Sequence, residues 1–418
     1  MLFTAPAVHS QVEMEGDTLY VPERAIILHG DKTSADRDVL AVFYTREDIS
    51  PNDPDAPRFL FLDSKGKIAF GIGGQLYATG SYDMCGAIDE SGFATYDINV
   101  PDNPSSRSRL GANVSNSSIF LKMVGKTTKF GMFQTYIQAN FTGDNGGYGF
   151  KLKQAYVSLG HLTAGLANST FVDASTQAPT IDNAGPSGKI SGKNILFRYT
   201  TPVRKGFSAA FSVELPRQTF TLGDQTESLS ARVPDVPVFV QYSWHPGQHI
   251  RLSGIFRDLP YRDLKTKQNR LQPGYGVMFS ALSNIDTEGY AQFFGHVAYG
   301  RGIGTYINDL SGEGYDLVYS ERPGQMEAPE MMGWTAGVIV NAMPKLQFTA
   351  SFSRSQVYEV GYLGGDTYRY GQYLAVNSFY NLDANLRLGT EYLHGWRNNY
   401  DGETGTANRL NLLVQYSF

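Results

Sequence analysis

The chain has 418 residues and a formal net charge of -5, and its composition excludes several classes of protein. No stretch approaches the roughly 18 apolar residues of a spanning helix, so any membrane crossing must be made by strands. Lipid accepts only helices and closed barrels, because every backbone amide needs a partner there. The 26 tyrosines and 25 phenylalanines and a mean hydropathy of -0.28 fit a barrel with one lipid face and one water face.

The N-terminal part of the chain lacks the sequence pattern expected of barrel strands. Residues 1–11 resemble the remnant of a signal peptide, because small residues at 8 and 10 precede Gln11 as at a cleavage site. Residues 12–66 are charged, contain several prolines and do not alternate, which predicts a short periplasmic extension. Two roles stay open for it: a tail lying against the barrel base, or a plug or partner-binding segment.

Residues 67–418 read as strands with period-two alternation, separated by turns rich in Gly, Asn, Asp and Pro. The pattern predicts an all-β fold, a transmembrane antiparallel β-barrel of about sixteen strands, enough for a water-filled lumen. The expected strands lie near 67–83, 113–126, 130–142, 149–159, 162–171, 193–201, 207–215, 236–245, 250–257, 273–283, 288–300, 331–341, 346–353, 368–380, 386–392 and 409–418.

The connections differ in length, and this sets the expected orientation. Short turns face the periplasm and long loops face outward in outer-membrane barrels. The expected short turns are 126–128, 246–248 and 341–345, and the expected long loops are 84–112, 172–192, 217–235, 258–272, 300–329 and 356–367. The segment 316–319 is either a further short strand or part of a loop.

No pattern points to catalysis. Seven histidines and one cysteine show no metal-ligand spacing, nucleophile elbow or phosphate loop, so we expect no enzyme, cofactor, metal or nucleic-acid partner. The glycines between Gly71 and Gly74 lie inside a strand, where small residues allow close approach or curvature of the wall. Outer-membrane phospholipases and proteases remain an alternative class, but no local pairing of Ser, His and acid singles one out.

Charge sorted by strand face predicts an electropositive lumen. The acidic residues expected on the lumenal face are Asp83, Glu214 and Glu391. Rings of Lys and Arg attract and select anions. The basic residues expected there outnumber the acids nine to three: Lys67, Lys122, Lys151, Lys153, Arg198, Arg251, Arg257, Arg387 and Arg409.

The last strand alternates from Arg409 to a terminal Phe418, a carboxy-terminal aromatic that resembles the ending of bacterial outer-membrane barrels. In such barrels this ending is recognised by the barrel-assembly machinery. We therefore expect the chain in the outer membrane of a Gram-negative bacterium, embedded in the lipid bilayer and assembled through Phe418.

Several segments resemble the DcaP-like porins, a family of trimeric sixteen-stranded outer-membrane channels for dicarboxylates and related anions. The resemblance implies a homotrimer, and pore-lining basic residues at Lys151 and Lys153, where the family commonly has arginines. A lysine carries a point charge and lacks the planar guanidinium with which arginine binds both oxygens of a carboxylate. The two lysines therefore imply a preference for anions in general more firmly than a preference for carboxylates. The similar segments are 151–157, 167–173, 299–308, 389–397 and the ending.

The sequence thus predicts a diffusion porin that passes small anionic or polar solutes. Its selectivity would come from the lumenal cations and from inward loops, above all 172–192. A non-conducting barrel with a structural or surface-interaction role is the competing interpretation. A soluble β-sandwich is the third, and the wide apolar band of the strands argues against it.

Overall fold

The computed structural model describes residues 26–29, 37–44, 50–54, 57–63, 67–86, 92–143, 148–358 and 362–418. The expected signal remnant, 1–11, lies outside these residues. No helix among the described residues has the length and apolar character needed to cross a membrane.

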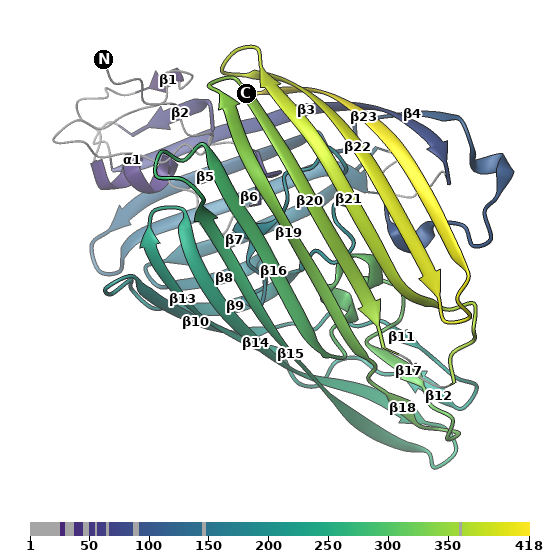
Figure 1. Cartoon of the computed structure of the whole chain (residues 1–418). Helices are drawn as coiled ribbons and strands as arrows, with labels where there is room; N and C mark the ends of the chain where they lie inside the picture. The colour runs from purple at the N-terminus through teal and green to yellow at the C-terminus, as the bar shows by residue number, and fades with distance from the viewer. Residues whose placement is uncertain are drawn as a thin grey trace.

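Sixteen antiparallel strands close into one barrel, as the alternation predicts (Figure 1). Each strand pairs with its neighbour in the chain, and the last pairs with the first, Leu412 facing Gly80. The barrel strands are β3 (Ile68–Cys85), β5 (Ser118–Thr127), β6 (Gly131–Gly143), β7 (Gly149–Leu159), β8 (Leu162–Asn168), β9 (Lys193–Thr200), β10 (Phe207–Glu214), β13 (Val236–His245), β14 (Gln248–Asp263), β15 (Gln268–Asn284), β16 (Ala291–Arg301), β19 (Glu330–Met343), β20 (Leu346–Val357), β21 (Tyr368–Asn381), β22 (Leu386–Asn399) and β23 (Thr404–Ser417).

Shorter elements decorate the two ends. At the end with the short turns lie β1 (Ile26–His29), helix α1 (Arg37–Tyr44) and β2 (Phe59–Leu62), close to the C-terminus (Figure 1). The remaining short elements belong to the long connections: β4 (Arg109–Asn113), β11 (Phe220–Thr221), β12 (Thr226–Ser228), β17 (Leu317–Tyr319), β18 (Met326–Glu327) and 3-10 turns at 95–97, 104–106, 174–176, 304–306 and 308–310. The short strand considered at 316–319 is β17, in a separate three-stranded sheet with β11 and β18.

One expected loop is wrong. The segment 258–272 was expected as a long loop, but β14 runs on to Asp263 and β15 begins at Gln268, leaving a tight turn between them. Fifteen residue pairs join the two strands, and Pro260 and Pro273 lie within this long hairpin. The hairpin extends beyond the apolar band of the wall. Its end contains prolines and charged residues, so the sequence there does not alternate between apolar and polar residues.

The two faces of the wall differ as a membrane barrel requires. Side chains such as Ile137, Val157 and Phe211 are exposed on the outer face, where lipid would cover them. Their neighbours in sequence, such as Gln138 and Ser212, point inward and are buried by loops that fold into the lumen. Those loops shape the passage.

Candidate functional site: a narrowed, lysine-lined lumen

The loop between β8 and β9, residues 169–192, folds into the barrel as the sequence analysis expected, and we call it the constriction loop. Its first part is held by Asp173, whose Oδ2 lies 2.8 Å from His249 Nε2 and accepts a bond from Ser280 Oγ at 2.6 Å. Arg251 Nη1 donates to the carbonyl of Val172 at 3.1 Å. All these partners lie on the inner faces of β14 and β15.

The tip of the constriction loop is held by Glu391 on β22. The backbone N–H groups of Ile181 and Asp182 each donate to one oxygen of this carboxylate at 2.8 Å. Asn377 donates to the Pro179 carbonyl at 2.7 Å. The loop therefore crosses the lumen from the β8–β9 wall to β21 and β22, and it narrows the passage.

A second inward segment, the connection 302–329, fills part of the lumen behind the constriction loop. Ser191 N donates to the Tyr306 carbonyl at 2.9 Å, and Asn308 N donates to the Lys189 carbonyl at 3.0 Å. Apolar side chains of both segments, among them Phe171, Ile190 and Ile307, pack in one buried cluster with the walls of β14 to β20. This side of the lumen is closed by packing.

On the opposite side, between the constriction loop and the early strands, the lumenal side chains are polar and several of them are partly exposed. The wall on this side carries a lysine cluster, defined here as Lys151, Lys153, Lys189 and Lys193. Lys151 is exposed and the other three are partly exposed, and Lys153 lies close enough to the other three to feel their charges. None of the four is fully buried, so this part of the lumenal wall carries a concentration of positive charge.

Lys151 and Lys153 were predicted from strand phase, whereas Lys189 and Lys193 were missed. Lys189 belongs to the constriction loop, so only the inward fold of the loop brings it to β7, whereas Lys193 begins β9 and pairs with Asn168 of β8, the neighbour of β7. Burial lowers the pKa of Lys189 from 10.5 to about 8, and the carboxylate of Asp182 opposes part of that shift. The only sequence signal was a second pair of lysines at the end of a long loop.

The other predicted cations point inward, but carboxylates hold three of them. Arg409 forms a two-pronged pair with Asp83, at 2.6 and 3.0 Å. Arg257 is fully buried between Asp235, at 3.0 Å, and Asp316, at 2.9 Å. Arg251 lies 3.8 Å from Asp173. The pairs of Arg257 and Arg251 fasten inward segments to the wall, whereas the pair of Arg409 with Asp83 joins β23 to β3.

The four remaining predicted cations lie at separate places in the barrel. Arg198 on β9 is partly exposed and its Nη1 lies 3.5 Å from the carbonyl of Asn168, at the start of the constriction loop. Arg387, at the short-turn end of β22, donates to Asn381 at 2.9 Å and stacks on Phe379. Lys122 holds helix α1, and Lys67 is exposed just before β3. Of these, Arg198 lies nearest to the constriction loop.

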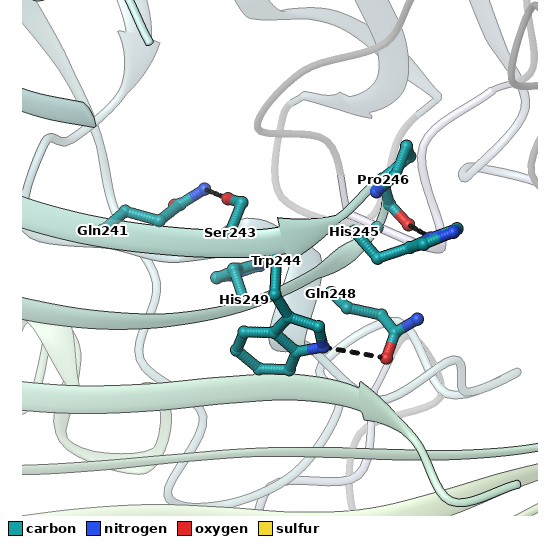
Figure 2. Close-up of a pocket in the computed structure, with 8 residues that line it drawn as sticks. Gln241, Ser243, Trp244, His245, Pro246, Gln248 and His249 are labelled. Carbon is teal, nitrogen blue, oxygen red and sulfur yellow. Dashed lines mark hydrogen bonds between the residues drawn. The ribbon is translucent and has the colours of Figure 1, made fainter. Parts of the chain in front are cut away.

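Two hollows mark the described lumen and its mouth. One lies between the loop tip and the wall of β3 and β23, lined by polar groups including Thr79, Asn183 and Asn411. The other, about 310 Å³, lies at the short turn between β13 and β14 (Figure 2). There the indole N–H of Trp244 donates to Gln248 at 3.2 Å. No metal-binding group of acids, histidines or cysteine occurs among the described residues.

Comparisons with known proteins agree with this architecture. The family described as the Porin subfamily matches residues 69–256. The outer membrane channel DcaP of Acinetobacter baumannii has a TM-score of 0.72 at 17% identity, over 85% of this chain and 99% of its own. The anion-selective porin of Comamonas acidovorans has a TM-score of 0.56 at 11% identity, over 84% of this chain and 100% of its own. No curated protein sequence matches.

The closed sixteen-stranded barrel, narrowed by an inward loop, has the fold of outer-membrane porins, and this fold and the subfamily match point to a channel. The localisation predicted from the ending and the band of outward apolar residues is thereby confirmed. The predicted resemblance to the DcaP-like channels is also confirmed, by the subfamily match over residues 69–256 and by the fold shared with DcaP.

Proposed function

We propose that this porin lets small anionic solutes diffuse across the outer membrane, with the lysine cluster as its selective element. The observation that carries the proposal is the cluster itself, four lysines gathered beside the constriction loop on the open side of the lumen. Fixed cations in a narrow, low-dielectric passage raise the local concentration of anions and slow cations. The solved porin of Comamonas acidovorans, which has the same fold, is described as anion-selective.

Dicarboxylates are the finer proposal. Two carboxylates on a short carbon chain match two or more lysines spaced along a wall, and each lysine supplies three donors to a carboxylate. Tyr136 and Tyr156, partly exposed on the same wall, offer further hydroxyl partners. Lysines lack the planar fork of arginine, so phosphates and monocarboxylates are expected to pass as well.

Proteoliposome swelling tests this function. Vesicles that carry the protein should swell fastest with a small dicarboxylate, more slowly with an uncharged sugar of similar size, and slowest with a matched diamine. Equal rates for all three solutes would contradict anion preference. No swelling with any solute would favour the non-conducting barrel, the competing interpretation.

We also propose a homotrimer, and one stretch of the outer wall supports it. Outward side chains from β5 to β16 are almost all apolar in the middle of each strand, whereas β20 to β23 present Arg354, Gln372, His394 and Asn408. Polar groups facing lipid are costly, so another copy of the chain would cover this stretch favourably. Unboiled electrophoresis should show a trimer band, and Arg354→Glu should weaken it.

Assembly through Phe418 is proposed from its place in the wall. The backbone of Phe418 exchanges two hydrogen bonds of 2.9 Å with Gly74, so the terminal residue completes the seam between β23 and β3. Deletion of Phe418 should lower the amount of folded barrel in the outer membrane, which heat-modified gel mobility would report. An unchanged amount would contradict this role.

A further inference from the structure

The N-terminal segment is built into the inner mouth of the barrel. Helix α1 lies on the inner faces of β3 and β5, where Val39 and Leu40 pack in a buried cluster with Ala69 and Val124. Lys122 Nζ donates to the carbonyls of Val42 and Phe43, at 3.1 and 2.7 Å, and so caps the C-terminal end of the helix. The wall thus supplies both apolar and polar partners to this segment.

Strand β3 leaves room for the segment, as its glycines predicted. A Cβ at Gly71 would lie 2.4 Å from the ring of Phe43 and 2.8 Å from Pro57. A Cβ at Gly73 would lie 2.9 Å from Pro57 Cα. These distances are too short for any side chain, so the close approach of the segment depends on glycine.

Residues 50–54 then reach the constriction loop. The side chain of Asn52 donates to the Ala178 carbonyl at 3.4 Å and accepts from the Thr180 N–H at 3.3 Å. The next residue, Asp53, is partly exposed, and its charge acts on Lys153. Asn52 is exposed and Pro54 buried, so the chain here lies between packed residues and solvent.

We propose that Asp53 is a tethered carboxylate that the N-terminal segment places at the lysine cluster, where it competes with anionic solutes and sets the selectivity of the channel. The contacts of Asn52 hold the neighbouring Asp53 beside the constriction loop, to which Lys189 also belongs. The inference rests on the proposed anion preference for its direction. The segment lies before residue 69, where the porin-subfamily match begins, so the device is a feature of this chain beyond that match.

The charge of Asp53 is tested by single substitutions in the full-length protein in planar bilayers. Asp53→Asn removes one negative charge at the lysines, so the anion-to-cation permeability ratio should rise twofold or more. Block of the current by citrate should also need a several-fold lower concentration. Asp38→Asn is the matched control, because Asp38 lies in the same segment but pairs with Lys126 at 2.9 Å, and it should change neither quantity.

The position of Asp53 is tested independently of any ion preference. In a Cys85→Ser background, Asp53→Cys should react with a negatively charged methanethiosulfonate in the open channel, and the current should change. Asp286→Cys, at an exposed short turn between β15 and β16, should react without altering the current. Heat-modified gel mobility confirms that each variant is folded.

The outcomes separate this inference from the proposed function. If the wild type shows no anion preference but Asp53→Asn still shifts permeability toward anions, the proposed function fails and the tethered carboxylate stands. If Lys153→Glu alters selectivity but Asp53→Asn does not, the proposed function stands and this inference is overturned. An unchanged current after modification of Asp53→Cys also overturns it, because residue 53 would then lie away from the passage.

Discussion

Removing the side chain of Glu391 should release the tip of the constriction loop and widen the channel. In Glu391→Ala the two backbone N–H groups of Ile181 and Asp182 lose the carboxylate oxygens that accept from them at 2.8 Å. Hydrogen bonds contribute about 0.5–1.5 kcal/mol each, and more when the acceptor is charged, so the loop tip loses at least about 1–3 kcal/mol of stabilisation. The bonds of Asn377 to Pro179 and of Tyr77 to Ile181 remain, at 2.7 and 3.1 Å.

Single-channel recording measures the effect. The loop tip in Glu391→Ala should leave the wall for part of the time, which gives a larger mean conductance and noisy transitions between levels. Arg397→Ala is a matched control: Arg397 is also an inward residue of β22, but it holds the carbonyls of Tyr96 and Ile98 and not the constriction loop. If Glu391→Ala conducts with the quiet level of the wild type, the loop is not held by this carboxylate and the reasoning is refuted.

Three further predictions follow from the same contacts. Because the pKa of Lys189 is about 8, this lysine loses its charge as the pH rises from 7 to 9, so anion preference should fall over that range. In Lys189→Gln the fall should be smaller than in the wild type, and a pH-independent reversal potential in the wild type would contradict this prediction. Gly71→Val should displace helix α1 and expose the segment before β3 to limited proteolysis, whereas Gly80→Ala, with open space around it, should not; equal cleavage in both would argue against the packing. Arg257→Met leaves Asp235 and Asp316 buried without their cation, which costs about 3–5 kcal/mol; the denaturation midpoint in urea should fall, and an unchanged midpoint would show that the pair is dispensable.

The strands of the barrel wall could be predicted from the sequence because every strand has one face toward lipid and one toward the lumen. Period-two alternation depends on each residue and its lipid or lumen side alone, so all sixteen strands were found. The exception is the long hairpin of β14 and β15, where the strands continue past the membrane and lose their apolar face. Lumen-facing arginines were found for the same reason.

The arrangement of side chains in the lumen was harder to predict because it depends on contacts between residues far apart in the chain. Glu391 holds amides about 210 positions away, and Arg257 meets Asp316 from a loop 59 positions on. A charge count along strand faces therefore included the arginines but missed the loop carboxylates that pair with them. It missed Lys189 for the same reason, since no local pattern tells whether a long loop folds inward.

The central claim is that the lysine cluster makes this channel prefer anions, and one measurement tests it most directly. The reversal potential is recorded in a potassium chloride gradient across a planar bilayer, for the wild type and for Lys151→Glu combined with Lys153→Glu. We expect the wild type to reverse at a potential of the sign set by chloride, and the double variant to reverse near zero or at the opposite sign. The same reversal potential in both proteins would contradict the account.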